Sequence, residues 1–235
     1  MRNAFILFVL LKSLVYAEFR IFEDNTGREV IAQFVDYKEN IVSLKNKSGS
    51  IYKVPFEKLS SSCQEFCIVA KKSLSEQLST LTSKSNFGVK FYSKRRKALV
   101  KDQGSGNDDF VQTFDPSVIF KNKDLYNPFT GNKATVILLG ESVKNKKVYK
   151  ILLKETFDFK VDARSEFVWE GDPVTVKYDE NASNGYIFGH KYTGYILIIK
   201  NKRSEVVFSR STRKSWIDSI DQILNTKVDK EWSNT

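Results

Sequence analysis

Histidine, methionine, cysteine and proline are all scarce in this sequence. Its 235 residues include one His, one Met, two Cys and four Pro. A Ser-His-Asp triad would have to use His190, and no serine lies in the context of a nucleophile elbow. His190 stands in "FGHKYTG", at the entrance to a predicted strand. We therefore expect it to be a loop residue and not a catalyst.

The two cysteines, Cys63 and Cys67, are four positions apart in "SSCQEFC". This spacing places both on one face of a helix, where a disulfide has poor geometry and closes too small a loop to add much stability. The spacing is also not that of a redox CxxC motif, and other zinc ligands are missing. We expect two half-buried thiols.

Acidic side chains show no arrangement typical of a catalytic or metal site. The loop "YDENASN", from Tyr178 to Asn184, offers oxygen ligands but lacks the Asp-x-Asp-x-Asp-Gly spacing of a calcium loop, so we expect a solvated turn. Neither a phosphate-cradling glycine loop nor a dinucleotide fingerprint occurs, and we expect no cofactor and no metal. The other carboxylates considered are scattered: Asp158, Asp162, Glu166, Glu170, Asp172, Asp179 and Glu180.

Aromatic residues are abundant by contrast, with 18 Phe and 10 Tyr, a usage that favours strands over helical bundles. Hydrophobic residues make up 41% of the chain, enough for one large or two smaller folded domains. The formal net charge is +10. Residues 71–113 hold much of this excess, with nine basic and four acidic side chains.

The first 17 residues read as a signal peptide. Arg2 supplies the positive start, Ala4 to Leu11 is an apolar run, and Val15 and Ala17 fit the small-residue cleavage pattern. The run is too short to span a bilayer, which needs about 20 apolar residues, and we expect no transmembrane segment after processing. The mature protein is predicted to begin near Glu18 and to be exported, to the periplasm or the extracellular space.

Residues 18–70 contain short strands separated by Gly and Asn turns, typical of a small closed meander. Pro55, in "VPFEKLS", is predicted to end the last strand because it cannot donate to a ladder. Ser60 to Ser62 are candidate caps for a helix that follows. "KKSLSEQLSTL" either extends that helix or forms another, and the basic residues and "GSGNDD" after it indicate a linker. Residues 71–113 are therefore predicted to be a basic helix followed by a linker.

Residues 114–235 return to strands. "TFDFKVD" alternates Phe157, Phe159 and Val161 on one face, as a half-buried strand does, and "YILIIK" is apolar on both faces and predicts a central strand. Seven such segments predict an antiparallel β-sandwich. A closing amphipathic helix is expected, with Ser215 as its N-cap and an apolar face of Trp216, Ile220, Ile223 and Leu224. The expected fold class is therefore mainly β.

Residues 18–67 resemble the first homology domain of the yeast endocytic adaptor Sla-one, a small Src-homology-3-like barrel found in many exported bacterial proteins. The matching residues are Arg20, Phe22, Gly27, "IAQFV" at Ile31 to Val35, Val42, Leu44, Gly49, and the "VP" and "KLS" of the stretch ending at Ser60. The family usually has Trp where this chain has Phe22. The second half is only loosely similar to the β-rich partner domain of such proteins.

The resemblance implies peptide binding, since the adaptor's barrel recognises an Asn-Pro-Phe motif followed by an acid. This chain has its own "NPF" at Asn127, Pro128 and Phe129. One interpretation is a ligand that docks on the barrel of the same or a neighbouring molecule. Because Thr130 and Gly131 follow in place of an acid, a turn before a strand is the interpretation we favour.

The clearest candidate binding site is the run "SKRRKALVK". Lys94, Arg95, Arg96 and Lys97 could contact a polyanion, and Phe91 and Tyr92 just before them could stack on it. We expect a non-catalytic exported binding or adaptor protein that recognises a protein or peptide partner. One alternative is a protein that binds an anionic envelope polymer through the basic linker. A less favoured alternative is a hydrolase on the sandwich, which would need two carboxyl groups about 5–10 Å apart.

Overall fold

A computed structural model describes residues 18–101, 108–179 and 187–233 of the chain. The protein is mainly β, with antiparallel sheets and a few helices. It divides into two compact units, Met1–Leu78 and Ser79–Thr235. The expected signal peptide lies outside the described residues. No helix in the described ranges is both long and apolar enough to span a membrane.

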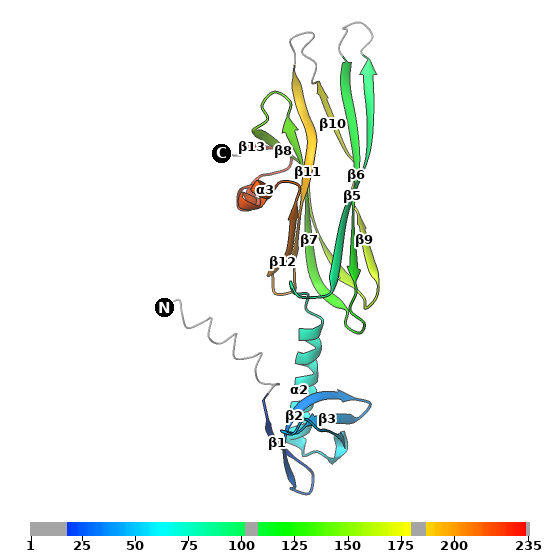
Figure 1. The fold of residues 1–235 in the computed structure, drawn as a ribbon, viewed down its shortest axis with the longest axis vertical. Helices are drawn as coiled ribbons and strands as arrows, with labels where there is room; N and C mark the ends of the chain where they lie inside the picture. The colour runs from blue at the N-terminus through cyan, green and yellow to red at the C-terminus, as the bar shows by residue number, and fades with distance from the viewer. Residues whose placement is uncertain (1–17, 102–107, 180–186, 234–235) are drawn as a thin grey trace, which may run out of the picture. The chain divides into compact units, whose positions relative to one another are not determined.

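Unit 1 is a four-stranded antiparallel meander followed by a helix (Figure 1). An isolated bridge between Asp24 and Leu59 brings the end of the meander back to the end of its first strand. The backbone bond from Ser60 N–H to the Glu23 carbonyl, 2.9 Å long, does the same. The elements are β1 (Arg20–Glu23), β2 (Glu29–Lys38), β3 (Ile41–Lys45), β4 (Ile51–Pro55), the 3-10 turn η1 (Phe56–Lys58) and α2 (Ser61–Leu78).

The core of unit 1 lies between the inner face of the meander and α2. Pro55 ends β4 as expected, and η1 turns the chain so that Leu59 is buried, with 3% of its surface exposed. Cys63 and Cys67 lie in the same core because both face it from α2. "KKSLSEQL" continues α2 to Leu78 and is not a separate helix.

Unit 2 is the larger unit. Its strands are β5 (Phe87–Lys101), β6 (Asp108–Asn122), β7 (Phe129–Ser142), β8 (Val148–Val161), β9 (Glu166–Glu170), β10 (Val174–Asp179), β11 (Phe188–Lys200), β12 (Val206–Ser211) and β13 (Glu231–Ser233), and its helices are α3 (Lys214–Asp218) and α4 (Ile220–Asn225). Strands β5, β6, β9 and β10 form one layer, and β7, β8, β11, β12 and β13 form the other.

The two layers pack on an aromatic core. Phe120 from β6 stacks on Phe159 from β8, with ring centroids 4.3 Å apart, and Phe157 stacks on Trp169 from β9 at 4.8 Å. The predicted alternation in "TFDFKVD" is confirmed, because Phe159 and Val161 are buried and Phe157 packs against the same cluster. These contacts make unit 2 the expected β-sandwich.

Strand β11 connects the layers. Its residues Phe188 and Gly189 pair with β10, and His190 onwards pairs with β7 in the other layer. Gly189 has φ +88°, and a Cβ there would lie 2.4 Å from the carbonyl oxygen of Lys177, so only glycine fits this crossing. Further along, β11 lies between β7 and β12, which confirms "YILIIK" as a central strand.

A third layer, the pair of helices α3 and α4, covers the far face of the β7–β8–β11 layer (Figure 1). Trp216 and Ile223 are fully buried there, and Ile220 and Leu224 pack beside them, as the amphipathic pattern predicted. The expected N-cap was wrong. The first helix begins one residue before Ser215, Arg213 occupies the cap position, and the chain turns between two short helices before ending in β13.

The expected basic helix and linker segment over residues 71–113 was confirmed for its helical start and was wrong for the basic segment after it, while residues 102–107 lie outside the described residues. Residues 71–78 belong to α2, and Phe87 to Lys101 form β5, which pairs with β6 residue by residue from Phe87 opposite Asn122. The basic run is therefore part of the sandwich. Its charge suggested a solvated connection, but its alternate residues Arg95 and Lys97 lie over the aromatic rings of Tyr192 and Phe110.

Candidate functional site

The predicted site residues all lie on β5, which is an edge strand. Among the described residues, β6 is the one strand that pairs with β5, so the opposite edge of β5 carries no partner strand. Between Phe87 and Leu99 the strand has five cationic side chains and no acidic one, namely Lys90, Lys94, Arg95, Arg96 and Lys97. The structure thus gathers the basic residues along one exposed edge.

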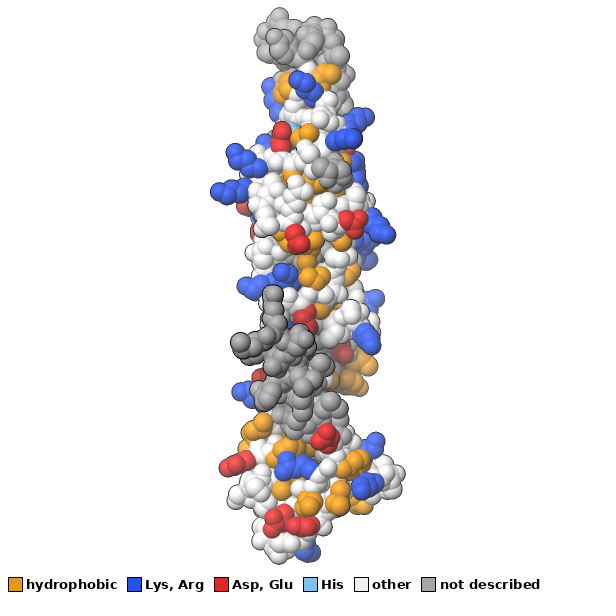
Figure 2. Space-filling model, turned by 90° about the vertical axis from the view of Figure 1, so that its left-hand side faces the viewer, with side chains coloured by type: hydrophobic (Ala, Val, Ile, Leu, Met, Phe, Trp, Pro, Cys, Tyr) orange, Lys and Arg blue, Asp and Glu red, His pale blue; other side chains and the backbone are white. Residues whose placement is uncertain are grey.

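Strand geometry separates the four consecutive cations. Successive side chains of a strand point to opposite faces, so Lys94 and Arg96 share the outer face while Arg95 and Lys97 face the other layer. The expected single patch of four cations is therefore two pairs on two faces. Figure 1 shows β5 beside β6, on the right of the sandwich in that view; Figure 2 looks at the opposite side, where other Lys and Arg side chains are scattered.

The inward pair lies over aromatic rings. The Arg95 guanidinium is 5.2 Å from the ring centroid of Tyr192, and the Lys97 ammonium is 3.6 Å from that of Phe110. Cations are attracted to the faces of such rings by about 0.5–2 kcal/mol. Burial raises the pKa of Tyr192 to about 12. Its hydroxyl is therefore neutral and does not balance the positive charge of Arg95.

The outward pair is exposed, as the inward pair also is. Lys94 lies directly opposite Asp115 on β6, and the Arg96 guanidinium donates to the same carboxylate over 2.8 Å. Tyr92 is on this face, with 47% of its surface exposed, and can meet a ligand. Phe91 cannot act in the expected way, because its ring is stacked on Tyr195 at 3.8 Å as part of the core.

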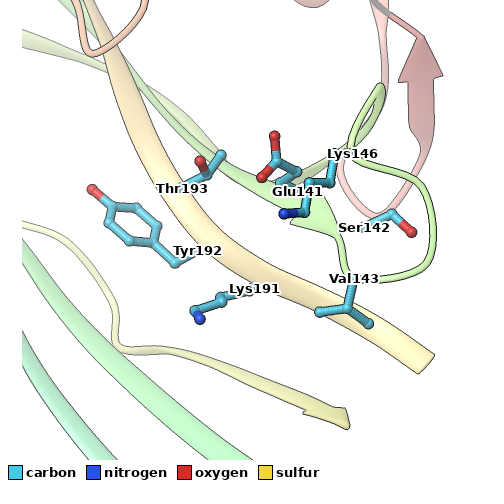
Figure 3. Close-up of a pocket in the computed structure, with 7 residues that line it drawn as sticks. All are labelled: Glu141, Ser142, Val143, Lys146, Lys191, Tyr192 and Thr193. Atoms are coloured by element: carbon cyan, nitrogen blue, oxygen red, sulfur yellow. The ribbon is translucent and has the colours of Figure 1, made fainter. Parts of the chain in front are cut away.

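A pocket of about 380 Å³ opens where β7 and β11 run side by side (Figure 3). No sequence pattern predicted this pocket, because its lining residues come from strands about fifty positions apart. Among the described lining residues, Glu141 carries the one carboxyl group, and Lys146 is drawn near it in Figure 3. The lining residues are Glu141, Ser142, Val143, Lys146, Lys191, Tyr192 and Thr193.

Arg213 holds the wall of this pocket together. Its guanidinium donates to Glu141 over 2.9 Å, to the Tyr149 hydroxyl, and to the Thr193 hydroxyl over 3.0 Å. Glu141 is thereby neutralised by an adjacent cation, and three strands are joined to the start of α3. The arrangement is that of a structural clamp. It places no second carboxyl group beside Glu141 among the described lining residues.

His190 lies within β11 and not in a loop, which corrects the expectation from sequence. Its side chain is 14% exposed, and Nε2 is 3.1 Å from Oε1 of Glu231 on β13. Burial lowers the pKa of His190 more than the neighbouring Glu231 raises it. The histidine is therefore a neutral packing residue near neutral pH.

Several of the scattered acids form ion pairs with nearby lysines. Glu166 pairs with Lys121 at 2.8 Å, and Asp158 with Lys133 at 3.4 Å. Within the described ranges, no three His, Cys, Asp or Glu side chains are grouped so that they could hold a metal ion. Both cysteines are free and fully buried, not half-buried. The predicted turn "YDENASN" lies outside the described residues from Glu180 onwards.

The "NPF" segment follows a bend at Leu125 and Tyr126 and leads into β7, in agreement with the turn before a strand that we favoured. The Asp124 carboxylate accepts from the backbone N–H of Tyr126 and of Asn127, over 2.9 and 2.8 Å. Phe129, the first residue of β7, is buried in the sandwich core at 3% exposure. A buried ring cannot dock on another domain, so the motif serves the fold.

The outer face of the meander in unit 1 exposes apolar side chains. Ile21 and Ile31 are register partners on β1 and β2, and each has 51% of its surface exposed. Phe19 and Ile51 are also exposed. Figure 2 shows hydrophobic side chains gathered on the part of the chain that holds this unit.

Comparisons with known proteins add no assignment. No protein-family model matches the chain, and no curated protein is detectably similar to it. A solved structure of a protein from Akkermansia muciniphila aligns with 63% of this chain and 80% of its own, at 10% sequence identity and a TM-score of 0.23. A score of that size transfers neither a fold nor a functional residue, so function has to be argued from the chain's own surface.

Proposed function

We propose that this protein is a non-catalytic exported binding protein of the periplasm or cell envelope that recognises a protein or peptide partner through β5. The observation that carries the proposal is the row of five cations on a strand whose second edge is unpaired among the described residues. Such a row attracts an anionic partner over a distance of about 8 Å at physiological salt. The partner is therefore expected to be acidic where it meets β5.

The resemblance of residues 18–67 to an adaptor barrel supports the same function. A chain that carries a small recognition domain followed by a sandwich with a basic edge is suited to joining two partners. Export is supported by the apolar run and small residues before Glu18. N-terminal sequencing of the mature protein tests export, with a first residue near Glu18 expected and an intact Met1 contradicting it.

The binding proposal is tested with a synthetic peptide of about ten residues in which Glu alternates with Val or Thr, a composition that favours an extended chain. Reversing two outward charges, in Lys94→Glu together with Arg96→Glu, should weaken binding at least about tenfold because like charges then face each other. Lys144→Glu with Lys147→Glu, in the exposed β7–β8 turn, is the matched control. Equal losses of peptide affinity in both variants would show that the effect comes from net charge alone, and would refute a site on β5.

A second candidate function is the binding of an anionic envelope polymer. It is favoured by the exposed ring of Tyr92 beside Lys94 on the outer face, since an aromatic ring among cations suits a polyanion. Heparin serves as the probe. Binding that falls steeply with salt, disappears on Ala replacement of Lys94 to Lys97, and exceeds peptide binding would favour this candidate.

The hydrolase alternative has the weakest support. Its chemistry needs two carboxyl groups across a cleft, and the described pocket offers Glu141 with Arg213 bound to it. We therefore do not assign that pocket a reaction.

A further inference from the structure

We propose that β5 receives the acidic segment of its partner as an added β-strand, so that recognition extends the sandwich by strand pairing. This inference rests on the proposed function and names how its partner binds. Three features of β5 carry it: an unpaired edge, an unbroken strand, and a charge pattern that rejects a second copy of itself.

The first feature is the supply of unpaired backbone groups. In an antiparallel pair, every second residue exchanges hydrogen bonds with its neighbour, and the residues between point their N–H and C=O outward. β5 pairs with β6 over all 15 residues from Phe87 to Lys101, so about half of its backbone groups face the free edge. This edge is longer than the five or six residues of a typical strand.

The second feature is that the edge is regular. The register between β5 and β6 runs without a shift, whereas the pairings of β7 with β8 and of β11 with β7 are interrupted by bulges. No proline lies in β5. Bulges, prolines and charges are the usual means of preventing strands from adding to an edge, and here only charge is present.

The third feature, the charge of β5, determines which kind of strand can pair with its free edge. A second copy of β5 would bring cations opposite cations, which is unfavourable for directly opposed strand residues. An acidic strand places carboxylates there, and the alternating peptide presents all its Glu side chains on one face, where Lys94 and Arg96 on the outer face lie opposite them. Exposed Tyr92 and Leu99, on opposite faces, add apolar contact. The partner segment is thus extended, acidic and free of proline.

The experiment follows hydrogen exchange of individual amides by NMR in the full chain, with and without the Glu-alternating peptide. Strand addition protects those β5 amides that face the free edge, while amides bonded to β6 change little. At about ten times the dissociation constant, exchange at the edge-facing amides should slow about tenfold. Heparin is the charge-only control, because it has no peptide backbone to add to the sheet.

A pair of variants supplies the second readout. Ala98→Pro and Leu99→Pro change no charge, and neighbouring N–H groups of a strand point to opposite edges. In one of the two variants the lost N–H faces the free edge, so no hydrogen bond to β6 is lost. Unfolding measurements identify this variant, because it keeps wild-type stability. That variant should lose peptide binding while retaining heparin binding, and Leu99→Ala controls for the lost side chain.

The possible outcomes separate the two proposals. Charge-dependent peptide binding without protection of edge-facing amides leaves the proposed function standing and overturns strand addition. Protection that appears without peptide and rises with protein concentration identifies a second copy as the occupant, which also overturns it. The absence of any charge-dependent binding at β5 contradicts the proposed function itself.

Discussion

At the scale of single residues, environment decides what each titratable side chain does. Arg95 and Arg96 are neighbours in sequence, yet one lies over the Tyr192 ring and the other pairs with Asp115 on the opposite face. Cys67 is fully buried in the core of unit 1, and the side chain of His190 is 14% exposed beside Glu231. Their chemistry is suppressed by burial, and this suppression can be measured.

Cys67 should be unreactive in the folded protein. Burial raises the pKa of its thiol to about 12, so at pH 8 only about one molecule in ten thousand carries the reactive thiolate. A thiol reagent such as DTNB should modify neither cysteine on mixing with the native protein, and both after addition of denaturant. Fast modification of the native protein would contradict the described core of unit 1.

His190 should make stability depend on pH. Because its pKa is lower in the folded than in the unfolded state, the unfolded chain binds the proton first, and unfolding becomes easier as pH falls below the usual histidine pKa of about 6.5. The cost is about 1.4 kcal/mol for each unit by which the pKa is lowered. Denaturant titrations from pH 7.5 to 5 should show a smaller loss for His190→Gln than for the wild type, and parallel curves would disprove the assignment.

At the scale of elements, β11 carries the architecture of unit 2. It joins the two layers through Gly189 and then fills the centre of one layer. Its central position could be predicted from "YILIIK", because a strand that is apolar on both faces needs cover on both. The crossing at Gly189 could not, since it depends on contact with Lys177 in another strand.

Gly189→Ala should destabilise unit 2 by at least about 2 kcal/mol, from the positive φ and the close carbonyl. Gly88→Ala on β5 is the control, because the nearest atom to its added Cβ is a flexible Lys123 carbon 3.5 Å away. Urea unfolding followed by tryptophan fluorescence measures both, since all three Trp lie in unit 2. Similar midpoints for the two variants would contradict the described crossing.

The prediction of a linker in place of β5 was wrong because a local sequence pattern does not contain the contacts between strands. "SKRRKALVK" has no apolar alternation, because two of its inward positions hold Arg95 and Lys97, and local charge predicted a linker. Those cations lie over Tyr192, which comes from β11 about a hundred positions away, and over Phe110, which comes from the neighbouring strand β6. The pocket at Glu141 was missed for the same reason, whereas the strands of unit 1 were predicted well from local turns and alternation.

At the scale of the whole molecule, the two units have separate cores. Unit 1 packs Leu59 and its neighbours against α2, and unit 2 packs its aromatic residues between two layers. Chains with two such cores need not unfold in one step. A mutation in one core should therefore leave the other unit folded.

Leu59→Asp tests this independence. An unpaired charge at a site with 3% exposure should unfold unit 1, since burial without a partner costs several kcal/mol. The amide NMR signals of unit 1 should collapse to unfolded positions while those of unit 2 persist. Ile68→Asp, on the exposed side of α2, should leave both sets in place. Melting of Leu59→Asp with the wild-type midpoint, or loss of the native NMR signals of both units, would refute the independence of the two units.

The central claim is that the charge of β5 selects an acidic partner, and exchanging the charges on both sides tests it most directly. The measurement compares the affinities of the wild type and of the variant carrying Lys94→Glu and Arg96→Glu for two peptides, the Glu-alternating peptide and its Lys-containing counterpart. We predict that the wild type prefers the Glu peptide and that the variant's preference shifts toward the Lys peptide by at least about a hundredfold in the ratio of affinities. An unchanged ratio would show that β5 does not contact the partner.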